Sequence, residues 1–596
     1  MTHCRLFLPA LLCFGVFVRA QTSPFDPHPL PADVQLDASM ADSDIQGSVY
    51  MPVDNWVYPA LDRLHALGYV DTAYLGLRPW TRAGIAHMLE LSADRIASDT
   101  GNDEARAIYI ALVREFKPDI ARGKGAPPPQ VELESVYTVV RGIGGTPLRD
   151  SFHLGQTIIN DYGRPYEGGF NNYSGFSARA MAGRFSLYFR GETQYAPSAA
   201  GYSAALAAYL SNNVDSIPFN DTSTFATIPE GPIAAIGQTR VMEAALSYHL
   251  LGHELSIGKE DHWLAPDAGA SMLWSNNAED IYEFQINRIE PLHIPGLSLL
   301  TGPFRYDFFV GALHGHTLVP NPAYNGNPAN GANVINPGNP WVHMEKVSFK
   351  PTRDLEFGFD RLTLWGGEGH SPVTLHNFLH SFFSFQNVTS SEKFGRDDPG
   401  DRIGTFDFSW RLPYLSHWVT LYTDSLVHDD VSPVSAPRRA GYHPGIYLAR
   451  FPGLQHLDLR LEGADTEPPS HAGVDQGQFL YWEYIERQGP TNNGSLFGDW
   501  VGRQGHGGQA WLTYHLSPQE FVQFQYRNAK ASPTFIPGGT TQNDFAVQAV
   551  KRIRKNYELR GWVQFERWKA PIYQPGLNND TVAAFQFTWF PPEQEK

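Results

Sequence analysis

Cysteine is almost absent from the sequence. Two of the 596 residues are cysteine, Cys4 and Cys13, and both lie within residues 1–20, which have the layout of a secretory signal peptide. A basic residue precedes an apolar run, and residues 18–20 supply the small side chains that signal peptidase requires. Cleavage after residue 20 leaves a chain without cysteine, which excludes disulfides, thiolate metal sites and cysteine nucleophiles.

Long apolar runs are also missing after this signal. A helix needs about 20 consecutive apolar residues to cross a bilayer, and residues 21–596 contain no such run. Insertion into a membrane must therefore use strands that close into a barrel, in which every backbone group is paired. The mean hydropathy of −0.32 and the aromatic content of 13% fit such a barrel, because only alternate residues face lipid.

An excess of basic residues is missing as well. The formal net charge is −17, from 45 Lys and Arg against 62 Asp and Glu. Loss of Arg5 and Arg19 with the signal removes two positive charges and lowers the net charge to −19. Because nucleic acid binding relies on Lys and Arg to neutralise phosphates, we expect no nucleic acid partner.

Motifs for catalysis and for cofactors are missing too. His253 and Glu254 begin like a zinc protease helix, but no second histidine follows at the required spacing. Gly502, Gly505 and Gly507 do not form a dinucleotide loop. We therefore assign no catalytic residue, no metal ligand and no cofactor. A carboxylate pair for glycan hydrolysis would not stand out among 62 acidic residues, so a barrel enzyme acting on glycans or lipids stays an alternative.

The first pattern present in the sequence is a helical periodicity. Residues 21–48 form a polar arm rich in Pro and Asp, and residues 49–125 follow the spacing of three amphipathic helices. The first helix should end at Gly68, the second should start at its N-cap Thr81, and the third should open near Asp103. We predict a small helical bundle over residues 49–125.

The period changes to two after the prolines at 127–129. Apolar and polar residues alternate in runs of about 8–12 residues, the length of a strand that crosses a bilayer at a tilt. The polar face is heavily charged, and the last run ends on an aromatic residue, Phe590. We predict that residues 130–590 form a mainly β fold, a transmembrane antiparallel β-barrel of about 16–18 strands; the alternative is a set of soluble sandwiches. The clearest runs are 184–195, 244–250, 354–359, 455–462, 521–527, 557–566 and 582–590.

Two insertions interrupt the runs. Ala196–Gln238 contains an apolar, helix-like stretch at Ser203–Leu210, and we expect it to fold into the lumen or to cap an opening. Val319–Trp341 is rich in Asn, Pro and Gly, and we expect a long surface loop.

Two segments carry a family resemblance. The first segment reads YMPVDNWVYPALDRL at residues 50–64, LGY at residues 67–69 and LRPWTR at residues 77–82. It resembles the N-terminal signature of the Wzi capsule assembly family. The second segment reads GKEDHWLAP at residues 258–266 and LWSNNA at residues 273–278. It is similar to a strand–loop–strand of that family. The usual Trp-Gly-Pro-Gly is replaced here by residues 264–267, which lack the glycines of a tight turn.

The resemblance implies an outer-membrane barrel of about 18 strands, with the helical bundle of residues 49–125 at its periplasmic side. It also implies a lectin-like, non-catalytic role. Such a protein binds capsular or other extracellular polysaccharide and helps to attach or organise it at the cell surface. The implied partners are that polysaccharide, outer-membrane lipid and the polysaccharide export machinery. The alternative function is a porin-like diffusion channel without dedicated polysaccharide binding.

Sugar recognition needs planar polar side chains and aromatic rings, because hydroxyl groups both donate and accept hydrogen bonds. The predicted polysaccharide-binding residues are Lys259, Glu260, Asp261, Trp263, Asn276, Asn277, Trp365 and Glu368. The competing interpretation is a charge network in the lumen with a Trp at the membrane interface, and a glycine-rich turn at 366–369. Trp56, Tyr58 and Trp80 are expected in the core of the bundle.

Overall fold

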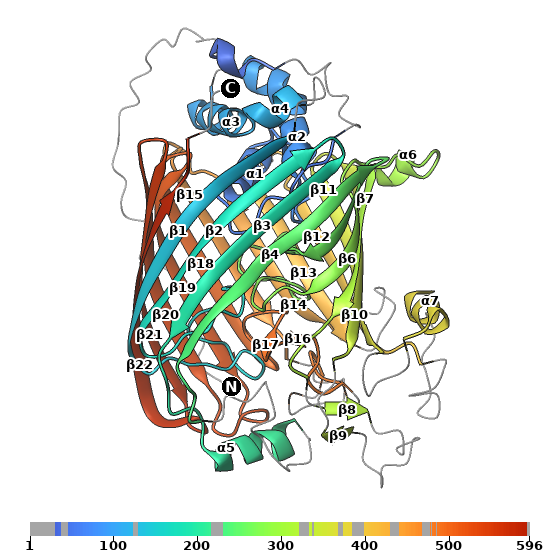
Figure 1. Cartoon of the computed structure of the whole chain (residues 1–596). Coiled ribbons are helices and arrows are strands. Elements are labelled where there is room, and N and C mark those ends of the chain that lie inside the picture. The colour runs from blue at the N-terminus through green and yellow to red at the C-terminus, as the bar shows by residue number, and fades with distance from the viewer. Residues whose placement is uncertain are drawn as a thin grey trace.

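The computed structural model describes residues 30–36, 46–99, 101–122, 129–215, 231–316, 318–320, 333–335, 339–366, 373–383, 398–415, 417–428, 440–467, 477, 479–483 and 486–592. Its main feature is a closed antiparallel barrel of 18 strands, in which each strand pairs with its neighbours in chain order (Figure 1). The barrel closes where β1 pairs with both β2 and β22. The predicted mainly β, antiparallel barrel of 16–18 strands is therefore confirmed.

The strands of the barrel are β1 (Gln130–Gly145), β2 (Gly169–Ala182), β3 (Phe185–Ala196), β4 (Ile236–Leu250), β5 (His253–Lys259), β6 (Tyr282–Arg288), β7 (Phe304–Ala312), β10 (Trp341–Thr352), β11 (Leu355–Trp365), β12 (Asp401–Arg411), β13 (Val419–His428), β14 (Gly441–Leu448), β15 (Leu457–Asp465), β18 (Gly505–Ser517), β19 (Glu520–Ala531), β20 (Thr541–Ile553), β21 (Tyr557–Ala570) and β22 (Gln574–Trp589). Two short hairpins lie outside the barrel sheet, β8 (Leu318–Pro320) with β9 (Asn333–Ile335), and β16 (Thr491–Asn492) with β17 (Ser495–Leu496).

Alternate residues of each strand face opposite sides of the wall. On β21, Val563 and Phe565 are about half exposed on the outer face, whereas Glu558, Gln564 and Glu566 are buried on the inner face. A strand places successive side chains on opposite faces, so the two-residue period of the sequence becomes an apolar outside and a polar inside. This period is the reason that the strands could be predicted.

The two ends of the barrel differ in their connections. At one end the strands join through turns as short as the one between β2 and β3, and at the other end long segments follow β1, β3, β5, β7, β11 and β15 (Figure 1). We call these the short-turn end and the long-loop end. The short-turn end carries α6 (Ser298–Thr301).

A helical bundle closes the short-turn end. It consists of α1 (Val57–Ala66), α2 (Arg82–Ser98), α3 (Asp103–Glu115) and α4 (Lys117–Arg122), preceded by a short 3-10 helix, η1 (Ala32–Val34). Thr81 caps α2 by accepting a hydrogen bond from the backbone of Gly84, as predicted. Gly68 follows α1 with a φ of 85°, which a C-cap glycine adopts without strain. The fourth helix was not predicted, because Pro118 was read as a stop, but proline is tolerated in a first helical turn.

Polar side chains of the barrel hold this bundle in place. Lys350 donates hydrogen bonds to the backbone carbonyls of Asp71 and Ala73, both at 2.7 Å. Glu356 accepts from the backbone amides of Leu75 and Gly76 at 2.9 and 3.1 Å. These two side chains form hydrogen bonds with backbone amides and carbonyls of the segment between α1 and α2. They therefore attach the helical bundle to the barrel wall. In the part of the chain that the structure describes, no helix is long and apolar enough to span a membrane.

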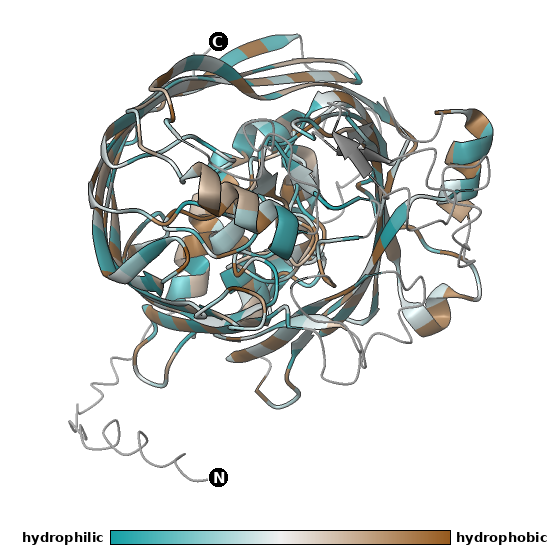
Figure 2. Cartoon of the chain, turned by 90° about the horizontal axis from the view of Figure 1, so that it is seen from below, coloured by the Kyte–Doolittle hydropathy of each residue, from teal (hydrophilic) through white to brown (hydrophobic). Residues whose placement is uncertain are grey.

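The long-loop end is partly filled from within. Segments from the β1–β2, β5–β6 and β15–β18 connections pass inside the wall, and the view along the barrel shows chain crossing the interior (Figure 2). Helix α5 (Ala204–Tyr209) and the π-helical turn Leu210–Val214 pack against Leu148 and Phe535 at this end (Figure 1). The described part of this insertion therefore lies over the long-loop opening, one of the two expected placements, and residues 216–230 lie outside the described residues.

One further helix lies outside the barrel. Helix α7 (Leu375–Phe383) packs Phe378 and Phe382 against Phe308 of β7. It also covers outward-facing polar groups, because Ser381 contacts His343 of β10 and the Phe382 carbonyl accepts from Arg361 of β11. The opposite face of α7 exposes three large apolar side chains, Leu375, Leu379 and Phe383.

Candidate functional site

Six of the eight predicted site residues lie at the inner connection between β5 and β6. We call residues 260–281 the inner segment, since they leave the wall after β5 and pass through the interior. Every residue of this segment is buried except Ala268 and Glu279. The predicted residues are therefore inside the protein and not on a surface loop.

Lys259, the last residue of β5, and Glu260, the first residue of the inner segment, both contact the wall. Lys259 donates to the backbone carbonyl of Val241 at 2.8 Å and forms an ion pair with Glu279 at 2.5 Å. Ser247 donates to one carboxylate oxygen of Glu260 at 3.5 Å, and the other oxygen is buried without a hydrogen-bond partner. Both side chains thus belong to the polar lining of the wall beside β4.

Asp261 joins three parts of the chain. One of its carboxylate oxygens accepts hydrogen bonds from the backbone amide of Val53 at 2.8 Å and from the Tyr162 hydroxyl at 2.9 Å. Val53 belongs to the segment before α1, and Tyr162 to the β1–β2 connection. Burial, together with the nearby Asp54 carboxylate, raises the pKa of Asp261 to about 6. Asp261 therefore ties the inner segment to the helical region and to a second inner loop.

Trp263 and the two asparagines make similar links. The backbones of Trp263 and Arg78 pair in both directions at 3.1 and 3.2 Å, and the Trp263 indole donates to the Asp267 carbonyl at 2.9 Å. The Asn277 amide accepts from the Asn160 backbone at 3.1 Å and donates to the Leu496 carbonyl at 3.0 Å, and the Asn276 carbonyl accepts from the Tyr162 amide at 2.7 Å. The two segments that carry the family resemblance are thus in direct contact.

The last two predicted residues are elsewhere. Trp365 ends β11 and lies against His343 and Phe378 at 6.0 and 5.7 Å between ring centroids. Glu368 lies outside the described residues. Polysaccharide binding by the eight residues stays a prediction.

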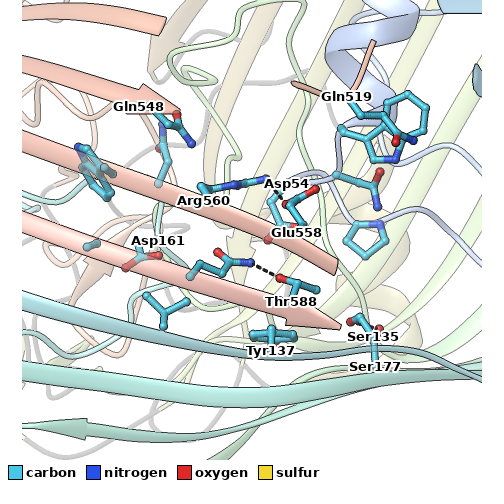
Figure 3. A pocket seen from close by; sticks show the side chains of 18 of the residues that line it. Asp54, Ser135, Tyr137, Asp161, Ser177, Gln519, Gln548, Glu558, Arg560 and Thr588 are labelled. Carbon is cyan, nitrogen blue, oxygen red and sulfur yellow. Dashed lines mark hydrogen bonds and ion pairs between the residues drawn. The ribbon is translucent and has the colours of Figure 1, made fainter. Parts of the chain in front are cut away.

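A cavity of about 1000 Å³ lies beside the inner segment, between the bundle and one side of the wall (Figure 3). Its lining comes from the segment before α1, from β1–β3, from the β1–β2 connection and from β18–β22. Inward-facing polar and aromatic side chains that are only half-buried supply one wall, namely Trp511, Gln525, Gln548, Arg560, Trp562 and Gln586. Because these side chains are only half-buried, a bound molecule can contact them without a rearrangement of the wall.

Hydrogen bonds and an ion pair link polar side chains within and between the strands of this wall. Gln525 of β19 donates to Gln548 of β20 at 3.4 Å, and Gln586 of β22 donates to Thr588 at 3.0 Å. Arg560 pairs with Glu558 at 3.5 Å (Figure 3). The Trp562 indole N–H is itself buried and has no hydrogen-bond partner among the described residues. The wall therefore offers amide and guanidinium donors beside aromatic faces.

The opposite side of the cavity is more tightly paired. Arg190 of β3 forms a two-pronged contact with Asp54 at 2.8 and 3.3 Å and bonds Glu243 at 3.1 Å. Burial alone would raise the pKa of Asp54, but the Arg190 guanidinium outweighs burial and lowers it. Asp54 belongs to the first resemblance motif, so part of that motif reaches the cavity.

The charge of the lining differs from that of the whole chain. Ten basic residues line the cavity against seven acidic residues, whereas the chain as a whole carries −17. A local positive excess on an acidic protein attracts anionic ligands to that place. The sequence analysis missed these residues, because they are spread over eight strands and alternate with lipid-facing positions like every other lumen residue.

Comparison with known proteins identifies the family. Residues 139–583 match the family model described as capsule assembly protein Wzi. The chain belongs to the Wzi capsule assembly family. The match covers most of the barrel, including the second resemblance segment, and it begins after the helical bundle.

Two Wzi-related comparisons bear on fold and context. A solved structure from Escherichia coli, described as Wzi, an outer-membrane protein involved in group 1 capsule assembly and a carbohydrate-binding β-barrel, superimposes with a TM-score of 0.60 at 15% identity. The alignment covers 90% of this chain and 98% of that one, which establishes the fold. A Klebsiella pneumoniae protein, described as an uncharacterized 55.8 kDa protein in the cps region, is 24% identical over 179 residues, 30% of this chain and 31% of that protein. The chain thus spans about a third of this curated relative.

Proposed function

We propose that this Wzi-family protein is an outer-membrane barrel that binds capsular or other extracellular polysaccharide and helps to attach or organise it at the cell surface. The role is non-catalytic binding, in keeping with a family of assembly proteins. The observation that carries the proposal is the half-buried wall of amide, guanidinium and indole groups on β18–β22. These groups suit a polyhydroxylated ligand, because sugar hydroxyls pair with planar donors and sugar rings stack on aromatic faces.

The charge of the cavity narrows the ligand class. With ten basic and seven acidic residues in its lining, the cavity favours an acidic polysaccharide over a neutral one. Guanidinium groups match carboxylates in a two-pronged geometry, and Arg560 has only a 3.5 Å contact with Glu558. We therefore propose that carboxylate-bearing sugars are the preferred ligand.

The orientation follows from the ends of the barrel. Outer-membrane barrels have short periplasmic turns and long extracellular loops, so the helical bundle at the short-turn end faces the periplasm and the long-loop end faces outward. The bundle is then the surface that the polysaccharide export machinery would meet. A cleavable signal over residues 1–20, which lie outside the described residues, would deliver the chain to this membrane.

Lipid is the second partner that we propose. The outer wall carries exposed apolar side chains on nearly every strand, such as Phe524, Phe545 and Phe585. Helix α7 continues this apolar surface over His343 and Arg361, which would otherwise face hydrocarbon. Covering polar wall groups with an amphipathic helix avoids the cost of leaving them unpaired in lipid.

Binding to purified protein tests the function. Full-length protein in detergent should bind the acidic polysaccharide of its own cell surface, and Trp562→Ala and Gln548→Ala should each weaken binding about tenfold, the effect of about 1.4 kcal/mol. Trp410→Ala on the outer wall is the matched control, because this Trp is exposed to the outside. Absence of binding by the wild-type protein would contradict the proposed function, and unchanged binding by both cavity variants would contradict the proposed site.

The diffusion-channel alternative predicts a different readout. The inner segment and the β15–β18 connection form a shared apolar core across part of the lumen, which opposes free passage of ions. We expect little conductance in planar bilayers. A steady conductance that polysaccharide leaves unchanged would instead support the channel.

A further inference from the structure

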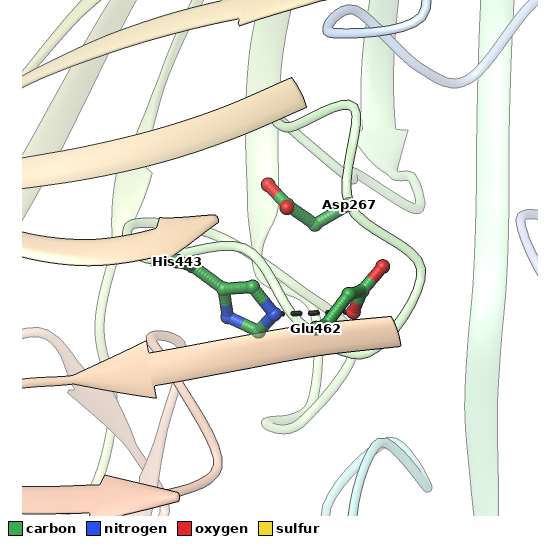
Figure 4. A group of neighbouring side chains, drawn as sticks. All are labelled: Asp267, His443 and Glu462. Carbon is green, nitrogen blue, oxygen red and sulfur yellow. Dashed lines mark hydrogen bonds and ion pairs between the residues drawn. The ribbon is translucent and has the colours of Figure 1, made fainter. Parts of the chain in front are cut away.

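Three buried side chains from distant parts of the chain meet between the inner segment and the wall. Asp267 belongs to the inner segment, His443 to β14 and Glu462 to β15 (Figure 4). One atom from each, two carboxylate oxygens and an imidazole nitrogen, lie within 4.8 Å of one another. All three side chains are buried, with exposures of 0% for Asp267, 1% for His443 and 7% for Glu462.

The Asp267 carboxylate has no hydrogen-bond partner within the described part of the chain. Both of its carboxylate oxygens are buried and accept no hydrogen bond. A buried carboxylate without a hydrogen bond or a counterion is costly, and proteins avoid it by pairing, by protonation or by coordinating a metal ion. Asp267 therefore needs either a proton or a bound cation to offset its buried charge.

The other two residues are held in the manner of metal ligands. His443 directs Nδ1 to the Asp499 carboxylate at 2.5 Å, which leaves Nε2 facing Glu462 at 3.1 Å (Figure 4). A carboxylate on the far nitrogen is the usual outer partner of a metal-binding histidine, because it fixes the ring and raises its basicity. The imidazole is thus oriented by a group outside the site.

Glu462 is oriented in the same way. One of its oxygens accepts from the Tyr422 hydroxyl at 2.7 Å and from the Ala268 amide at 2.9 Å, and the other accepts from the Gly269 amide at 2.8 Å. A Cβ at Gly269 would lie 2.6 Å from that second oxygen, so a side chain there would push the inner segment away. Glycine at 269 permits the close approach that brings Asp267 beside β14 and β15.

The surrounding charges favour a cation. Asp424 and Asp407 lie near enough to Asp267 to interact with its charge, and Asp424 accepts from the Met272 amide of the same inner segment. Two permanent cations lie nearby: Lys346 is already shared between Asp360 and Asp407 at 3.0 and 2.8 Å, and Arg460 lies 3.9 Å from Glu462. The interior beside Asp267 thus holds more carboxylates than permanent cations.

We propose that Asp267, His443 and Glu462 form a structural site for a divalent transition-metal ion of the Zn²⁺ class. One imidazole nitrogen with two carboxylate oxygens is a ligand set that Zn²⁺ accepts, whereas Ca²⁺ and Mg²⁺ prefer oxygen ligands throughout. The ion would join the inner segment to β14 and β15. This site goes beyond polysaccharide binding and does not depend on it.

The competing arrangement is a proton in place of the metal. A protonated His443 could bridge Asp499 and Glu462 at the same distances, with Asp267 protonated. Metal content decides between the two. Full-length, tag-free protein in detergent, treated with a chelator and reloaded with excess Zn²⁺, should keep one equivalent of zinc per chain after dialysis, measured by plasma mass spectrometry.

A matched pair of variants locates the ion. Asp280→Asn is the control, since Asp280 lies in the same inner segment and is also buried with both oxygens unpartnered. We expect Asp267→Asn to lower zinc affinity at least about tenfold, and Asp499→Asn to lower it about 10- to 100-fold through the orientation of His443. Asp280→Asn should bind zinc as the wild type does.

Three results would overturn the proposed site. The wild-type protein could retain no zinc, zinc affinity could fall equally in Asp267→Asn and Asp280→Asn, or zinc affinity could be unchanged in both variants. If Asp267→Asn does not fold, the wild type alone still decides. Co²⁺ bound at this site should give a visible absorption band that Zn²⁺ abolishes on titration, and absence of that band in folded protein would count against the proposal. Polysaccharide binding, measured in parallel, reports separately on the proposed function.

Discussion

The two sides of the barrel interior are built differently. On one side, which we call the filled side, the inner segment packs against β7 and β10–β13 through an apolar core that contains Trp274, Phe309 and Phe497. On the other side, which we call the open side, β18–β22 and β1–β3 face a cavity of about 1000 Å³ with half-buried polar groups. The same alternation of inward and outward residues thus gives a packed core on one side and a half-buried polar surface on the other.

We expect the filled side to contribute mainly to the stability of the fold and the open side mainly to ligand binding. On the filled side, Asp261 contacts the protein through hydrogen bonds from Val53 and Tyr162, and Trp274 packs in the apolar core. Open-side residues such as Gln548 and Arg560 are only half-buried and line the cavity, so their side chains can contact a ligand. Substitutions on the filled side should therefore act mainly on folding, and substitutions on the open side mainly on ligand affinity.

The largest expected contrast is between two tryptophans. Trp274 is fully buried and stacks on Phe497 at 3.8 Å between ring centroids, so Trp274→Ala should lower the free energy of unfolding by about 3–5 kcal/mol. Trp562→Ala on the open side should cost about 1 kcal/mol or less. The temperature at which the compact, heat-modifiable gel band is lost measures both. Equal shifts for the two variants would break the distinction between the sides.

A pH-dependent contrast comes from the β1–β2 connection. Burial alone would lower the pKa of His153, but the carboxylates of Asp150 and Asp215 outweigh it and raise the pKa to about 9. Asp150 also accepts from the Tyr573 hydroxyl, and Asp215 pairs with Arg503. The unfolded value is about 6.5, so this proton contributes stability that is complete below pH 6.5 and is lost as pH rises through 9.

The size of this effect is about 3 kcal/mol, from the difference between the two pKa values. Unfolding temperatures of the wild type at pH 6 and pH 9.5 should differ accordingly, and His153→Gln should show a smaller difference. The same pH dependence in the variant would mean that other groups control it.

A smaller effect on stability is expected for Asp261, which lies in the second segment that resembles the family. Asp261→Ala should destabilise the protein by about 2 kcal/mol, because it leaves the Val53 amide and the Tyr162 hydroxyl buried without an acceptor. Asp261→Asn keeps an oxygen for both donors and is the matched control. We expect Asn to be tolerated and Ala to be destabilising in thermal unfolding. If Ala is as stable as Asn, the hydrogen bonds of Asp261 do not hold the inner segment.

The smallest expected effect is on charge recognition. Arg560→Gln should weaken binding of acidic polysaccharide about threefold at low salt with little change in stability, since exposed charges are screened by salt. The difference from wild type should shrink at high salt. Lys551→Gln is the control, because Lys551 lies on the outer face of β20 and pairs only with Glu520 among the described residues.

The strands could be predicted from the sequence because lipid and lumen impose opposite polarity on successive residues. Phe185 and Leu187 alternate with Ser186 in the sequence, and the structure places them on the outer and inner faces as expected. The helix caps at Thr81 and Gly68 are equally local signals. These features depend on neighbours within a few residues.

The arrangement of the interior depends on distant contacts and could not be predicted. Trp274 stacks on Phe497 more than 200 residues away, and no local pattern shows that the inner segment folds inward. Gln548 on the open side and Asp360 on the filled side both look like lumen residues in the sequence. The residues Asp267, His443 and Glu462 have no motif spacing for the same reason.

Thiol labelling inside the cavity tests the central claim most directly, because both native cysteines lie within residues 1–20. Gln548→Cys would place a single thiol on the open side, and Tyr414→Cys, at a fully exposed turn, would serve as the reference. We predict that acidic polysaccharide slows maleimide labelling at 548 and leaves labelling at 414 unchanged. Equal labelling rates at 548 with and without saturating polysaccharide would contradict binding in the cavity.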